Sequence, residues 1–99
     1  MIKAIEETVN EGYPTFYYQS FETTGLDLLA YLASHIEEKG YAPSQREMMR
    51  ACYLVHSSIR YQLSKLREHG FIIYQRGVAR GLQVTDKGMA ALQAREARR

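Results

Sequence analysis

The chain has 99 residues, enough for one small domain. Its hydrophobic share of 45% is typical of a globular core and argues against a disordered chain. The apolar runs are far shorter than a membrane span, and the acidic start of the chain lacks the apolar core of a signal peptide. The single cysteine, Cys52, excludes an internal disulfide and favours a reducing, cytoplasmic setting.

The net charge of +2 hides a strong asymmetry along the chain. Residues 1–38 carry one base and seven acids, a net charge of −6, whereas residues 39–99 carry twelve bases and four acids, a net charge of +8. This polarity indicates that one half of the domain meets a polyanion. Two solvated faces of opposite charge would give the same pattern, so charge alone does not decide.

The first elements predict an N-terminal arm. An apolar stripe in residues 2–9 predicts a short helix, which Gly12 and Pro14 end. The aromatic stretch at residues 13–21 is typical of extended chain, which can pair with a sheet edge or with a second copy of the protein.

A helix is predicted from Thr24, which is placed to cap it, to a stop at Gly40. Its buried stripe consists of Leu28, Leu29, Leu32 and Ile36. A second helix of about two turns follows, because Ser44 and Glu47 have the S-x-x-E spacing of a capping box. We expect Met48 and Ala51 to face the core, and residues 52–54 to form the turn.

The segment HSSIRYQLSKLREHG, residues 56–70, predicts a third helix that ends at Gly70. Next comes a β-hairpin, FIIYQRGVARGLQV, with Arg76 and Arg80 near its glycine-flanked tip. Thr85 and Asp86 favour the start of a C-terminal helix. The apolar stripe of this last helix is narrow and consists of Met89 and Leu92.

Helix, short helix, turn, helix and basic hairpin is the element order of a winged helix-turn-helix. The predicted fold class is therefore mainly α with a small β-hairpin (α+β), built on a three-helix core. We expect a single domain over residues 1–99. It would comprise an N-terminal arm at residues 1–23, a winged-helix core at residues 24–84 and a C-terminal helix at residues 85–99.

Three motifs in the predicted core are shared with a known family. They are an I-x-x-x-G-x-x-P-S-x-x-E join at residues 36–47, an L-x-x-L-x-x-x-G-F-I run at residues 63–72, and an R-G-L exit from the hairpin at residues 80–82. In these motifs the chain resembles the N-terminal DNA-binding domain of LexA repressors. The segment VTDKG after the hairpin is closer to other winged-helix regulators.

The sequence departs from that family in three respects. Cys52 stands where a glycine is usual in the turn. Val55 stands where a serine would cap the third helix, so we expect His56 or Ser57 to cap it one residue later. The chain ends where a self-cleaving Ser-Lys domain would begin, so we expect no self-cleavage. Because the groove-facing residues differ, the resemblance does not imply an operator sequence.

We expect the third helix to enter the major groove of double-stranded DNA. With Ile59, Leu63 and Leu66 facing the core, the predicted base contacts are Ser57, Ser58, Arg60, Tyr61 and Ser64. Arg60 is the favoured base reader because a guanidinium can pair with guanine O6 and N7. The predicted contacts of the short helix, third helix and wing with the DNA backbone are Ser44, Gln45, Arg46, His56, Lys65, Arg67, Arg76 and Arg80. Taken singly, each base is also consistent with solvated surface.

The sequence offers little for catalysis. His35, His56 and His69 lack metal-ligand spacing, and the adjacent Ser64 and Lys65 diverge on a helix and cannot form a dyad. We therefore predict no enzymatic activity, no cofactor, no metal, no membrane partner and no small-molecule ligand.

The predicted function is sequence-specific binding of double-stranded DNA in transcription regulation. Two alternatives stay open: a winged-helix module that binds proteins, and a plasmid or phage replication or partition factor. We expect a homodimer, because helix-turn-helix proteins commonly occupy two half-sites. The aromatic stretch at residues 13–21 is favoured as the dimer contact over Met89 and Leu92.

Overall fold

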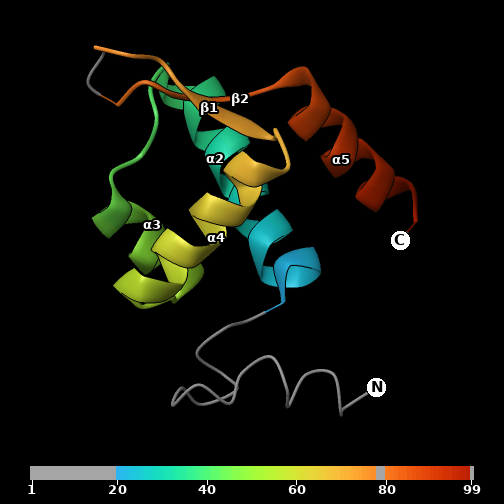
Figure 1. Ribbon diagram of the computed structural model, residues 1–99, viewed down its shortest axis with the longest axis horizontal. Helices are drawn as coiled ribbons and strands as arrows, with labels where there is room; N and C mark the ends of the chain where they lie inside the picture. Colours follow the sequence, from blue (N-terminus) through green and yellow to red (C-terminus); the bar gives the residue numbers. More distant parts are fainter. Residues whose placement is uncertain (1–19, 78–79, 99) are drawn as a thin grey trace.

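A computed structural model of the protein describes residues 20–77 and 80–98 (Figure 1). The elements in chain order are η2 (Phe21–Gly25), a π-helical turn, α2 (Leu26–Lys39), α3 (Gln45–Cys52), α4 (His56–Glu68), β1 (Ile72–Tyr74), β2 (Leu82–Val84) and α5 (Asp86–Ala97). The predicted fold class, mainly α with one small hairpin, is confirmed. The predicted helix within residues 2–9 and residues 13–19 of the aromatic stretch lie outside the described residues.

The first helix begins earlier than predicted. Thr24 lies inside η2, where its N–H donates to the carbonyl of Ser20 at 2.8 Å, so the prediction that Thr24 caps the helix was wrong. The physical reason is a tertiary contact. The ring of Phe21 stacks on His69 with the ring centroids 4.4 Å apart, and it also packs near Phe71. This contact between aromatic side chains favours helical structure one turn upstream of the local capping signal.

The core lies between α2, α4 and the hairpin. Leu28, Leu29 and Leu32 of α2 are fully buried, as predicted, and Ile36 is partly buried. They pack with the apolar stripe of α4 and with the first residue of β1. In Figure 1, α3 and α4 lie on one side of α2, and α5 lies on the other.

The short helix α3 has the predicted start. The hydroxyl of Ser44 accepts from the N–H of Glu47 at 3.1 Å, and the carboxylate of Glu47 accepts from the N–H of Ser44 at 2.8 Å. Met48 is buried as predicted, but Ala51 is exposed, so that part of the prediction was wrong. Cys52, one full turn after Met48, packs against the core in its place.

The left-handed residue of the turn between α3 and α4 is Tyr53, not Cys52, which stands where the related family usually has a glycine. Tyr53 has φ 55°, whereas Cys52 is the last residue of the helix. The N–H of Leu54 donates to the carbonyl of Met49 at 3.1 Å and closes the turn. The side chain of Tyr53 is 92% exposed, so packing within the described residues does not compensate for this backbone conformation.

The helix α4 starts at His56, with Val55 as the preceding cap residue and no side-chain cap hydrogen bond. The prediction that His56 or Ser57 would cap one residue later was therefore wrong. Instead, the imidazole of His56 bonds to Gln45 across the turn, with 2.5 Å between Nε2 and Oε1, and joins the starts of α3 and α4. Gly70, with φ 75°, follows the end of the helix as predicted.

The hairpin and α5 complete the structure. β1 and β2 are antiparallel, with Ile72 opposite Val84 and Tyr74 opposite Leu82. Thr85 caps α5 as predicted, because its hydroxyl accepts from the N–H of Gly88 at 3.0 Å. An ion pair of 2.8 Å between Arg95 and Asp27 then holds α5 against α2. None of the helices within the described ranges is long and apolar enough to cross a membrane.

Candidate nucleic-acid interface

The buried face of α4 is wider than its apolar stripe. Ile59, Leu63 and Leu66 are buried as predicted, but Ser58 and Gln62 are also buried, with exposed fractions of 4% and 0%. The prediction that Ser58 faces outward was therefore wrong. η2 packs against α4 and covers Gln62, since a Cβ on Gly25 would lie only 2.7 Å from Oε1 of Gln62.

The remaining predicted base contacts lie on accessible faces of α4. Ser64 and Arg60 are exposed, and Ser57 and Tyr61 are partly exposed. Arg60, Ser64 and Arg67 follow an i, i+4, i+7 spacing and therefore form one flank of the helix. This flank is the one nearest to the hairpin, because it shares a surface hollow with Tyr74 of β1.

The hollow has a volume of about 380 Å³ and lies between the start of α3, α4 and β1. Four residues of its lining were predicted to contact DNA: Gln45, Arg60, Ser64 and Arg67. The other two, Leu63 and Tyr74, were not. No carboxylate belongs to this lining. The hollow therefore presents two guanidinium groups, an amide and two hydroxyls, all of which can donate hydrogen bonds to an anion.

Tyr74 was missed in the sequence because it reads as an ordinary strand residue. The guanidinium carbon of Arg67 lies 5.4 Å from the centre of its ring, within the range of a cation–π interaction. Burial raises the pKa of the Tyr74 hydroxyl, and the positive charge of Arg67 opposes that shift. Tyr74 is therefore a neutral hydroxyl at physiological pH, with a cation held over its ring.

The start of α3 contributes Gln45 to the same hollow. The amide oxygen Oε1 of Gln45 can only accept a hydrogen bond, so Nε2 of His56 is the donor in their contact. The amide nitrogen is the group that Gln45 then has to offer a ligand. Ser44 acts as the cap of α3, and Arg46 is exposed beside it.

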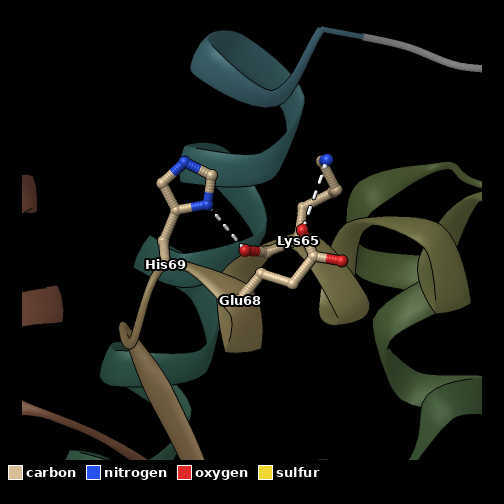
Figure 2. Close-up of polar contacts among 3 residues, drawn as sticks. All are labelled: Lys65, Glu68 and His69. Atoms are coloured by element: carbon tan, nitrogen blue, oxygen red, sulfur yellow. Dashed lines mark hydrogen bonds and ion pairs between the residues drawn. The ribbon is translucent and has the colours of Figure 1, made fainter.

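The opposite flank of α4 is electrostatically different. Lys65 pairs with Glu68, with 3.5 Å between Nζ and Oε1 (Figure 2). Nζ of Lys65 also lies 5.9 Å from the centre of the Tyr61 ring. Figure 2 also shows His69, whose Nδ1 lies 2.8 Å from the carbonyl oxygen of Lys65 at the end of the helix. The charge of Lys65, a predicted backbone contact, is thus partly balanced within α4.

The two predicted wing arginines differ in their surroundings. Arg76 is exposed near the tip, whereas the guanidinium of Arg80 lies 5.2 Å from the centre of the Tyr41 ring. The N–H of Ser44 is the main cause of a lowered pKa of Glu47, and the charge of Arg80 lowers that pKa further. Arg80 therefore attaches the wing to the connection between α2 and α3.

Nothing in the described part of the chain suggests reactive chemistry. Within residues 20–77 and 80–98, no group of three or more His, Cys, Asp or Glu side chains is placed to hold a metal ion. Burial raises the pKa of the Cys52 thiol, and the negative charge of Asp27 raises it further. The thiol is therefore protonated at neutral pH and is a poor nucleophile.

Comparison with known proteins points to one family. The family model described as LexA DNA binding domain matches residues 23–81, from within η2 to the residue before β2. The chain is 32% identical over 72 residues to the LexA repressors of Lactobacillus acidophilus and Oenococcus oeni. The match covers 72% of this chain but only 35% and 34% of those repressors, so the chain spans about a third of their length. On this sequence match, and with the winged-helix architecture described above, the chain belongs to the LexA DNA-binding domain family.

Proposed function

We propose that this protein binds double-stranded DNA in a sequence-specific manner and regulates transcription. The observation that carries the proposal is the exposed flank of α4, where Arg60 and Arg67 border a hollow without carboxylates beside a basic wing. Membership of the LexA DNA-binding domain family supports it. Since the target is DNA, we place this function in the cytoplasm, and it requires no catalytic group or cofactor.

In the proposed complex, α4 lies in the major groove with its N-terminal half closest to the bases. The residues proposed to approach base edges are Ser57, Arg60, Tyr61 and Ser64, without the buried Ser58. Arg60 is the fifth residue of α4 and has the only long basic side chain in that half of the helix. We assign it the bidentate contact with a guanine.

The backbone contacts are proposed to position α4 rather than to specify sequence. They come from the start of α3, the sides of α4 and the wing: Gln45, Arg46, His56, Lys65, Arg67, Arg76 and Arg80. Each phosphate that is neutralised releases counterions, so the affinity should fall steeply as salt is raised.

Selection of bound sequences from a random duplex pool tests this function. The expected result is enrichment of one motif and retention on DNA that decreases with salt. Enrichment of no sequence, together with salt-dependent retention, would reduce the proposal to non-specific DNA binding. No retention even at low salt would refute the proposal and favour a module that binds another protein.

We also propose that the protein acts as a homodimer on two half-sites. Of the aromatic residues expected to form the contact, Phe21 instead packs within its own chain, on His69 and Phe71. The proposed contact is therefore restricted to residues 13–19, with the 40% exposed Met89 of α5 as the alternative. Truncation should stop before Ser20, because η2 is part of the packed structure.

Sedimentation of the full chain and of a chain lacking residues 1–19, each alone and with DNA, tests the dimer. A dimer that becomes a monomer on truncation is the expected result. A monomer under all conditions would refute dimerisation, and a dimer that survives truncation would move the contact to α5.

A further inference from the structure

We propose that the end of the hollow between α4 and β1 binds a single DNA phosphate, and that Tyr74 positions Arg67 to hold it. This inference rests on the proposed DNA-binding function and assigns one of its backbone contacts to a defined site. It also adds Tyr74, a strand residue with no charge, to the interface.

The lining of the hollow has the composition expected for an anion site. At the end nearer the hairpin is Arg67, which lies beside Tyr74 and whose N–H groups donate, and Leu63 supplies an apolar wall. Arg60 lines the other end, two helical turns or about 10 Å nearer the start of α4. Gln45 also belongs to that end, because it contacts His56, the first residue of α4. The separation of the two arginines lets Arg60 reach a base edge while Arg67 meets the backbone. No carboxylate in the lining competes for Arg67.

Tyr74 supplies the order that an exposed arginine otherwise lacks. Its ring lies under the guanidinium of Arg67 at 5.4 Å, so one face of the guanidinium is occupied and its N–H edges remain available. A cation held before DNA arrives loses less conformational entropy on binding. Because the strand that carries Tyr74 leads into the wing, the same contact fixes the spacing between α4 and the hairpin.

Gln45 is positioned by a second contact. Its Oε1 is bonded to the imidazole of His56, which turns the amide N–H groups into the donors available to a phosphate. Gln45 is also the first residue of α3, where the helix dipole is positive and favours an anion. Gln45 therefore offers its donors at the Arg60 end of the hollow, where α4 begins, and leaves the opposite end to Arg67 and Tyr74.

The other cations near α4 differ from Arg67. Lys65 pairs with Glu68 on the opposite flank, and Arg80 lies over Tyr41 near Glu47. Arg67 combines an aromatic support with a lining free of acids, and so it is the residue assigned to the phosphate.

The test measures binding of a labelled duplex by fluorescence anisotropy over a series of salt concentrations. The variants are Arg67→Ala, Tyr74→Leu, Tyr74→Phe and the double variant Arg67→Ala/Tyr74→Leu. Arg98→Ala, which removes an exposed arginine after the end of α5, is the matched control. Thermal unfolding of each variant establishes that it is folded. A set of duplexes with one methylphosphonate each, which removes a single phosphate charge, locates the contact.

Arg67→Ala should flatten the dependence of log K on log salt by about one unit and weaken all duplexes similarly. Tyr74→Leu should weaken binding about two- to fivefold, as expected for loss of a cation–π contact, and Tyr74→Phe should bind like the native protein. In the Arg67→Ala background, Tyr74→Leu should have no further effect. One methylphosphonate position should weaken the native protein but not Arg67→Ala.

Three results would refute the proposed phosphate site while leaving DNA binding intact. They are an unchanged salt dependence in Arg67→Ala, an effect of Tyr74→Leu that persists without Arg67, and no methylphosphonate position that depends on Arg67. A native protein that binds no duplex at any salt concentration would instead refute the proposed function itself.

Discussion

Replacement of Gly88 by alanine should destabilise the whole domain, although glycine is normally the poorer helix residue. Gly88 is the third residue of α5 and is buried against the end of β2 and the segment before β1. A Cβ at this position would lie 2.4 Å from the carbonyl oxygen of Phe71 and 3.0 Å from Cγ1 of Val84. Real Cβ atoms essentially never approach within 3.0 Å, so α5 would have to move by at least 0.6 Å from a backbone group.

The magnitude follows from three contributions. Overpacking of this kind costs about 1–3 kcal/mol. The same carbonyl of Phe71 accepts from the N–H of Thr85 at 2.9 Å, and loss of that hydrogen bond would cost about 1 kcal/mol more. Alanine returns up to about 1 kcal/mol through its higher helix propensity. We therefore expect a net loss of about 2 kcal/mol, or a fall in Tm of about 10 °C.

Urea denaturation followed by circular dichroism measures this loss directly. The cap of α5 is not altered, because alanine keeps the N–H that donates to Thr85. Gln93→Ala, at an exposed position of the same helix, is the control and should change stability by less than about 0.5 kcal/mol. A Gly88→Ala protein as stable as the native one would show that α5 does not pack closely on the carbonyl of Phe71.

Further predictions concern the DNA contacts and the cap of α3. Arg60→Ala should lose about 1–3 kcal/mol on the best site and relax preference at one base pair, measured on a panel of site variants; a uniform loss would make Arg60 a backbone contact. Replacing both Arg76 and Arg80 by alanine should flatten the salt dependence of log K by about two units, and an unchanged slope would exclude wing contacts. Ser44→Ala should cost about 1 kcal/mol of unfolding free energy in urea, and no loss would refute the cap's contribution. The lowered pKa of Glu47 means that its ionised form stabilises the fold; this stabilisation is complete above the ordinary glutamate range and is lost as the pH falls through the folded pKa. Urea denaturation at decreasing pH should therefore show that the free energy of unfolding falls less steeply with acid in Glu47→Gln than in the native protein. An unchanged pH dependence would contradict the stabilising role of the Glu47 carboxylate.

Local signals in the sequence were sufficient to predict the helices of the core, α5 and the hairpin. The capping box of Ser44 and Glu47, the stop at Gly40 and the cap at Thr85 all depend on contacts within four residues along the chain. The order of these elements predicted the winged helix-turn-helix, and the hairpin follows from two apolar runs around a glycine-flanked tip. These features could be predicted because their physical cause is local.

The helical spacing of apolar residues did not determine which residues beside the apolar stripe of each helix are buried. Ser58 is polar and was expected outside, but it is buried, as is Gln62, against which η2 packs. Met48 can be followed inward by Ala51 or by Cys52, at three or four residues, and the docking of α3 selected Cys52. Both outcomes depend on the rotation of one helix against another, which a one-dimensional pattern leaves undetermined.

Within the candidate interface, the sequence identified the basic residues and the structure determined their neighbours. The predicted Arg67 and Gln45 come together in one hollow only because α3, α4 and β1 pack side by side, and Tyr74 joins them from a strand. Arg67 and Arg80 read alike in the sequence, yet one lies over Tyr74 at the hollow and the other over Tyr41. The charge of a side chain is a property of its residue type, whereas its partners are a property of the tertiary packing, and only those partners distinguish the two arginines.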